Sequence, residues 1–216
     1  MINARLVAYT TPTIEVGASN PEEFISYAAR VSNPSNQNNY DTAEGLLKYC
    51  IRNQHWSIFE MVNAVVEVKA PRDITRQMLR HRSFSFQEFS QRYSDEITFC
   101  GREVRMQDNT NRQNSVDCSD LGIVQDWYLD IEKLTGEITE AYKEFRERNV
   151  AKEVARVLLP EGLTMSTMYV NGTLRSWLHY LDVREENGTQ KEHIELANKC
   201  RKVLEPVFPT VLGTKV

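Results

Sequence analysis

A run of alternating residues in the first third of the chain sets the strongest limit on its fold. Mostly polar residues separate five apolar ones, which are Val62, Ala64, Val66, Val68 and Ala70. This period of two predicts a strand over residues 62–70 with one face against a core. Pro71 follows at once and opens a helix, in which the arginines at 72, 76 and 80 share one face. The fold must therefore accommodate a buried strand that runs directly into a helix.

Other local patterns place further strands and helices along the chain. Residues 5–10 and 163–170 have the composition of strands. We expect helices over residues 20–32, 42–53, 124–145, 174–181 and 189–204, and a helix or turn that reaches Arg156 and stops near Pro160. Asn20, Pro21 and Glu23 form the start signal of the first helix. Residues 33–39 and 107–115 are polar and aperiodic, which predicts loops, the second of them mobile.

These elements predict an α+β fold. No repeat, low-complexity segment or linker divides the 216 residues, so we expect a single domain over residues 1–216. Its modest mixed or antiparallel sheet is flanked by several helices. The helix over residues 124–145 carries a long apolar stripe that includes Trp127, Tyr128 and Leu134. This stripe is typical of packing against the core or against another subunit.

Composition narrows the classes of function. The net charge is −4, which gives no support for general binding to nucleic acid or to a membrane surface. The sequence has no apolar run long enough for a membrane span and no signal peptide. The four cysteines are scattered and form no Cys-x-x-Cys pair, so we expect reduced thiols, no metal site and a cytoplasmic location.

Residues 80–93 read Arg-His-Arg-Ser-Phe-Ser-Phe-Gln-Glu-Phe-Ser-Gln-Arg-Tyr and concentrate the chemistry of the chain. Three guanidinium groups this close repel one another unless an anion neutralises them. Arginine also grips phosphate with two parallel hydrogen bonds. A solvated surface run is the plainer alternative, but the three interleaved phenylalanines indicate partial burial. The segment therefore predicts a site for an anionic ligand such as a nucleotide.

The spacing of this segment resembles the signature of the flavin-dependent thymidylate synthases: Arg-His-Arg, seven residues, Ser, and Arg two positions later. Four further stretches are similar to segments of that family, at residues 28–32, 55–60, 156–160 and 171–177. The resemblance implies the family's sheet-and-helix fold and reductive methylation of dUMP. It also implies FAD as cofactor, methylene-tetrahydrofolate as one-carbon donor and NADPH as reductant. A homotetramer with sites shared between subunits is implied as well.

The resemblance also assigns residues to the two ligand sites. Those carried over to the flavin are Ser32, His55, Ser57, Glu60, Arg80, His81, Arg82, Glu88, Thr173, Leu174, Arg175 and His179. Those carried over to the nucleotide are Gln77, Met78, Leu79, Arg80, Glu88, Phe89, Ser90, Gln91, Arg92, Arg156 and Arg184. The side chains of Met78 and Leu79 are better explained as core. The chain departs from the family at Met61 and Thr173, where relatives commonly have His and Asn.

Arg184 is the expected catalytic residue. In the family the matching arginine contacts the pyrimidine and promotes ionisation at N3, and a fixed cation beside that nitrogen favours the anion. From the sequence alone, a cationic end of a helix explains Arg184 equally well. Glu88 either orients an arginine or binds a ligand hydroxyl group.

Two other functions stay open from the residues alone: a nucleotide- or RNA-binding protein without catalysis, and a flavoenzyme with a changed substrate. The acidic net charge weighs against the first, and the arginines at 92, 156 and 184 weigh against the second. The matched motifs contain no cysteine, which agrees with flavin chemistry.

Overall fold

The computed structural model describes residues 1–186 and 188–214 and is built around a four-stranded antiparallel sheet. The strand order is β1 (Asn3–Tyr9), β2 (Asn63–Pro71), β6 (Met165–Thr173) and β3 (Ser85–Glu88). Strands β2 and β6 pair over their whole length, from Asn63 opposite Thr173 to Pro71 opposite Met165. The α+β class and the small antiparallel sheet are confirmed, and so is the strand predicted from the alternation near residue 62.

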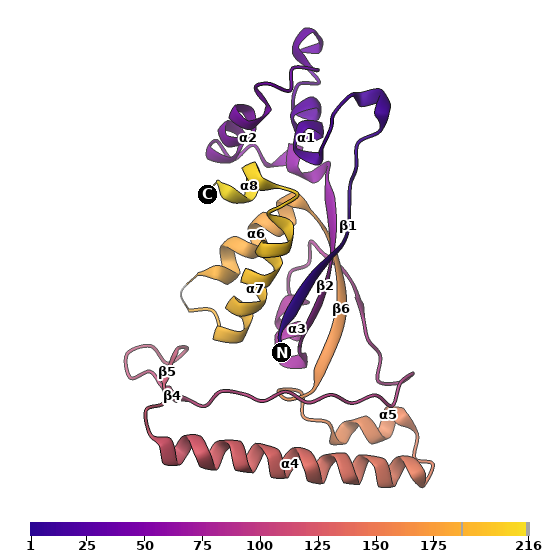
Figure 1. Cartoon of the computed structure of the whole chain (residues 1–216), viewed down its shortest axis with the longest axis vertical. Coiled ribbons are helices and arrows are strands. Elements are labelled where there is room, and N and C mark those ends of the chain that lie inside the picture. The colour runs from indigo at the N-terminus through magenta and orange to yellow at the C-terminus, as the bar shows by residue number, and fades with distance from the viewer. Residues whose placement is uncertain (187, 215–216) are drawn as a thin grey trace.

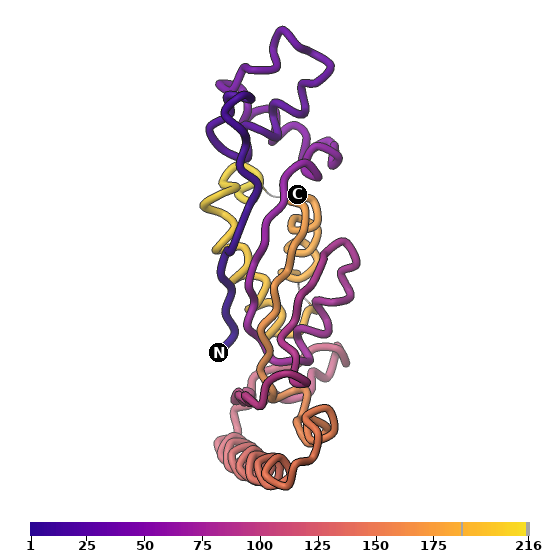
Figure 2. The backbone as a smooth tube through the Cα atoms, turned by 90° about the vertical axis from the view of Figure 1, so that its right-hand side faces the viewer, coloured from indigo at the N-terminus to yellow at the C-terminus, as the bar shows by residue number. Residues whose placement is uncertain are grey.

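Helices cover one face of this sheet. Helices α6 (Leu174–Glu185) and α7 (Lys191–Leu204) lie side by side on that face, and Figure 2 looks onto the sheet with these helices behind it. Helix α3 (Arg72–Met78) packs against β2 and β6. The alternation explains the layering, because Ala64, Val66 and Val68 are fully buried or nearly so whereas the neighbouring Lys69 is exposed.

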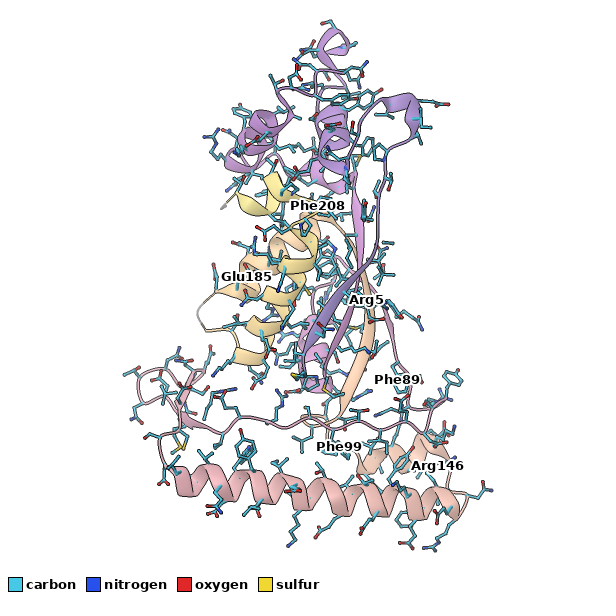
Figure 3. The ribbon with its side chains drawn as sticks, in the orientation of Figure 1. Arg5, Phe89, Phe99, Arg146, Glu185 and Phe208 are labelled. Carbon is cyan, nitrogen blue, oxygen red and sulfur yellow. The ribbon has the colours of Figure 1, made fainter. Side chains whose placement is uncertain are left out.

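Short helices close one end of the molecule. They are α1 (Pro21–Ala29), α2 (Ala43–Arg52) and α8 (Pro209–Gly213) (Figure 1). The predicted start of α1 is confirmed, because the Asn20 side chain accepts a hydrogen bond from the backbone N–H of Glu23 at 2.9 Å. The buried Glu22 accepts from the N–H of Val211 at 2.8 Å and so ties α1 to α8. Phe208 is fully buried and lies between this end and helices α6 and α7 (Figure 3).

The long helix α4 (Leu121–Glu147) crosses the other end of the molecule (Figure 1). Next to it lie the short helix α5 (Lys152–Ala155) and a hairpin of β4 (Arg105–Gln107) and β5 (Ser115–Asp117). Arg146, labelled in Figure 3, donates to Asp95 at 2.6 Å and fastens the C-terminal part of α4. The indole N–H of Trp127 donates to the carbonyl of Arg102 at 2.7 Å and fastens the N-terminal part.

The structure revises or extends the picture from the sequence at four points. Helix α3 ends at Met78, so Arg80 lies beyond it and does not share its face. The motif contains the strand β3, which its mixture of charged and aromatic residues concealed. The loop expected over residues 107–115 begins and ends in the hairpin strands, while its mobility stays a prediction. Of the two kinds of packing expected for the apolar stripe on α4, packing against the core does not occur, because Tyr142 is the only residue of that helix that is buried within the described chain. Packing against another subunit stays a prediction.

The remaining short turns are η1 (Ile14–Val16), η2 (Pro34–Asn36), η3 (Trp56–Glu60) and η4 (Arg156–Leu158). The last of these forms with α5 the predicted element before Pro160. Across residues 1–186 and 188–214, none of the helices combines the length and the apolar character that a membrane crossing requires.

Candidate active site

The first half of the motif folds against the start of α6. After α3 the chain turns through Arg80, and β3 then pairs with the end of β6, with Ser85 opposite Asn171. Helix α6 follows β6 without a break. The buried ring of Phe84 packs on Trp177 of α6, with ring centroids 4.6 Å apart. A Cβ atom at Gly172 would lie 2.2 Å from the Phe84 ring, so glycine is needed for this close approach.

The centre of the site is a contact between His81 and Arg184. The Nε of Arg184, near the C-terminal end of α6, donates to Nε2 of His81 at 2.8 Å. His81 is therefore neutral with its proton on Nδ1. Burial, and then the neighbouring side chains of Arg184, His179 and Arg80, lower the pKa of His81 to about 4. The contact uses only Nε of the guanidinium, so in the described part of the chain the two terminal nitrogens of Arg184 are left for a ligand.

A cavity of about 500 Å³ opens beside this contact. It lies between η3 and α6, and its lining residues are Trp56, Glu60, Ser83, Arg175, Ser176, Leu178, His179 and Asp182. Arg175 forms an ion pair with Glu60 across the cavity wall. The ring of His179 is centred 6.3 Å from that of His81, so the cavity adjoins the central contact. Its hydroxyl and guanidinium donors, the flat ring of Trp56 and the apolar side chain of Leu178 fit a flavin.

The other residues assigned to the flavin divide between this cavity and its surroundings. Thr173 caps α6, where its hydroxyl accepts from the N–H of Ser176 at 3.3 Å, and the Leu174 side chain is fully buried in the core. Ser32 lines a separate open hollow between α1 and α2 that Tyr49 also lines. The exposed His55 ring lies edge-on to Tyr49, with centroids 5.7 Å apart. Ser57 and Arg82 are both exposed.

Glu88 is the centre of a second cluster, on β3. Its carboxylate accepts from Arg76 at 2.8 and 3.0 Å and from the Ser166 hydroxyl at 2.8 Å. Arg72 lies 3.9 Å away. These contacts favour the first of the two roles considered for Glu88, the orientation of an arginine. Arg156 lies close enough to Arg72 to contribute, after burial, to the lowered pKa of that guanidinium.

The second half of the motif lies far from Arg184. Arg92 pairs with Glu153 of α5 at 3.3 Å, and both side chains are more than half exposed. The Ser90 hydroxyl accepts from the N–H of Arg92 at 3.3 Å, whereas Gln91 is buried. Figure 3 labels Phe89, the neighbour of Ser90, and Glu185, the neighbour of Arg184, and the two lie well apart. One chain therefore does not bring all the nucleotide residues together.

Three groups around Gln77 were not anticipated from the sequence. His193 of α7 is fully buried and faces the Gln77 side chain, and Gln190 contacts its other end. The ring of Tyr180 packs between His81 and His193, at 5.0 and 5.8 Å. The only available signal was a histidine at an apolar position of an amphipathic helix. Met78 is fully buried, as expected for a core side chain, and Leu79 packs against the core.

Comparison with known proteins gives consistent matches over nearly the whole chain. Residues 5–210 match the family described as thymidylate synthase complementing protein. A probable flavin-dependent thymidylate synthase of Paramecium bursaria Chlorella virus 1 is 48% identical over 211 residues, which cover 97% of each chain. The flavin-dependent thymidylate synthase of Synechocystis is 44% identical over 214 residues, again 97% of each chain.

A solved structure shares the fold. It is a UMP/dUMP methylase, PolB, from Streptomyces cacaoi, bound with 5-Br dUMP. The TM-score is 0.83 at 24% identity, with 99% of this chain and 94% of that chain covered. The sheet and its helical layer are therefore an architecture seen before in a solved structure.

Proposed function

Since the chain belongs to the flavin-dependent thymidylate synthase family, we propose that Arg184, held by His81, is the residue that acts on the pyrimidine of dUMP. The reaction of the family is methylation of dUMP, and the cofactor is FAD. The observation that carries the assignment of Arg184 is its 2.8 Å contact with His81. This contact fixes a permanent cation beside His81, whose ring lies 6.3 Å from that of the cavity residue His179, and such a cation can favour the N3 anion of uracil.

The cavity between η3 and α6 is the proposed place for the flavin ring. Arg175, Ser83 and His179 supply donors for its polar edge, and Trp56 and Leu178 supply an apolar wall. A bound, reduced flavin supplies the hydride that the methylation needs. The chain's own part is to orient the two rings, to keep Arg184 charged beside the pyrimidine, and to shield the site from water.

Arg92 and Arg156 are the proposed clamp for the substrate phosphate. The exposed pair between Arg92 and Glu153 contributes little to stability, so a phosphate can replace that carboxylate at small cost. Arg156 adds a second guanidinium near Arg72. Two arginines that approach one dianion provide the bidentate hydrogen bonds that phosphate prefers.

The separation of these arginines from Arg184 supports a site shared between subunits, and we propose a homotetramer. The exposed apolar stripe of α4, including Trp127, Tyr128 and Leu134, supplies a surface for such an assembly. We also propose that residues 1–216 act as one domain, that methylene-tetrahydrofolate and NADPH are the cosubstrates, and that the protein works in the cytoplasm.

The test is tritium release from C5-tritiated dUMP in the presence of FAD, NADPH and methylene-tetrahydrofolate. We expect flavin-dependent release by the wild type and its loss in Arg184→Ala. Arg148→Ala is the matched control, because that arginine is exposed just beyond α4. Activity in Arg184→Ala at the control's level would refute the assignment of Arg184. No release from a folded, flavin-loaded wild type would leave a nucleotide-binding protein without catalysis.

A further inference from the structure

We propose that His193 is a positioning residue that fixes the amide of Gln77 so that it offers dUMP a hydrogen-bond donor. The proposal rests on the assignment of Gln77 to the nucleotide site made above. It concerns a residue of α7, which lies outside the stretches matched to the family above. Three linked contacts, all between side chains of the described chain, carry the argument.

The first step is the direction of the hydrogen bonds. Glu192 is anchored by Arg105, which approaches its two carboxylate oxygens at 2.8 and 3.0 Å. Burial opposes ionisation of Glu192, but the hydrogen bonds from Arg105 and other donors outweigh it, so the pKa of Glu192 is lowered. An ionised carboxylate can only accept. The Gln190 atom 3.0 Å from Glu192 is therefore its amide nitrogen, Nε2.

The orientation of the Gln190 amide determines the orientation of the Gln77 amide. Because the nitrogen of Gln190 faces Glu192, its oxygen faces Gln77 and accepts from Nε2 of that side chain at 2.7 Å. The oxygen of Gln77 must then face His193, at 3.1 Å from Nδ1. His193 consequently carries its proton on Nδ1 and donates to Gln77. Both ends of the Gln77 amide are held, and one N–H of Nε2 remains for a ligand.

The surroundings of His193 indicate the role of its hydrogen bond to Gln77. The imidazole is fully buried, and burial, with Arg184 and His81 next in effect, lowers its pKa to about 3. Among the described residues its Nε2 has no hydrogen-bond partner. Burying such a polar ring costs stability that a leucine would not cost. The hydrogen bond that offsets this cost leads to Gln77, and the proposed catalytic Arg184 lies close enough to His193 to lower its pKa.

Because the Gln77 amide is held in one orientation, it offers the nucleotide site an N–H donor and not an acceptor. A free glutamine can present either its oxygen or its nitrogen, but here the oxygen is held by His193. Without His193 the amide can rotate and offer an acceptor to the same ligand atom. Loss of one neutral hydrogen bond corresponds to about a threefold to tenfold change in binding.

The experiment measures binding of dUMP to the FAD-loaded protein by calorimetry, for four variants. His193→Asn keeps an N–H donor near the position of Nδ1, whereas His193→Gln is equally polar but extends its amide toward the position of Nε2. His193→Leu removes the donor, and Gln77→Leu removes the group that it positions. We expect the asparagine variant to bind dUMP as the wild type does. His193→Gln and His193→Leu should bind dUMP about threefold to tenfold more weakly. In the tritium-release assay, their KM should be raised and their kcat little changed.

The outcomes separate the two proposals. If Gln77→Leu binds dUMP like the wild type, Gln77 is not in the nucleotide site and both proposals fail at this residue. If Gln77→Leu weakens binding but the three His193 variants do not, the positioning role is overturned and the nucleotide site stands. Should His193→Leu fail to fold, equal affinities of the asparagine and glutamine variants would still overturn the proposal.

Discussion

Replacing His81, which accepts the hydrogen bond from Arg184, perturbs the proposed site at its centre. A hydrogen bond with one charged partner contributes about 1.5–3 kcal/mol, and the bond from Arg184 to His81 is 2.8 Å long in a half-buried position. If this energy keeps Arg184 in its reactive orientation, its loss corresponds to a fall of about tenfold to hundredfold in kcat/KM. We expect a fall of that size in His81→Leu.

His81→Gln is the matched variant, because its amide oxygen can reach the position of Nε2 and accept the same hydrogen bond. It should retain much more activity than His81→Leu. The assay is tritium release from C5-tritiated dUMP, normalised to bound flavin because His81 is also a predicted flavin contact. Wild-type release by a flavin-loaded leucine variant would refute the reasoning, and so would equal losses in the two variants.

Three further predictions concern stability. The pKa values of His81 and His193, about 4 and about 3, lie below their ordinary 6.5, so the unfolded chain takes up protons first as the pH falls. The contribution of these two histidines to stability should be constant above about pH 6.5 and decline toward pH 3, and calorimetric Tm values should fall less steeply with acid in His193→Asn. Gly172→Ala should lower the free energy of unfolding by about 1–3 kcal/mol, whereas Gly136→Ala on the open side of α4 should not, as urea titrations will show. Glu88→Gln should cost about 1–3 kcal/mol in the same titration, because it leaves the partly buried donors Arg76 and Ser166 poorly paired.

The elements of the fold with strong local signals could be predicted from the sequence. The alternation in β2 has a single interpretation, since five apolar side chains at a period of two can be buried together only on a strand. The start of α1 was equally clear, because Asn20 and Pro21 act within one turn of the chain. Strand β3 was not, because it is short and its edge position is determined by pairing with β6, about eighty positions later in the sequence.

The site shows the same division between local and distant causes. The residue types and spacing of the Arg80 segment pointed to an anionic ligand, whereas Arg184 was assigned from the resemblance to the family. The partnership of Arg184 with His81 joins residues 103 positions apart, and that of Gln77 with His193 joins residues 116 apart. Such contacts depend on how α6 and α7 pack on the sheet, which no local pattern specifies.

The exposed stripe of α4 and the separation of Arg92 and Arg156 from Arg184 both need an explanation. A stripe that the sequence marks as apolar stays exposed along most of α4 in one chain, although large exposed apolar faces are costly in water. At the same time, Arg92 and Arg156 are placed away from Arg184, although a nucleotide must meet a phosphate clamp and a pyrimidine contact together. Each fact alone has several explanations. A subunit assembly that covers α4 and brings one chain's clamp to another chain's Arg184 accounts for both, and this is why we propose an active site completed between chains.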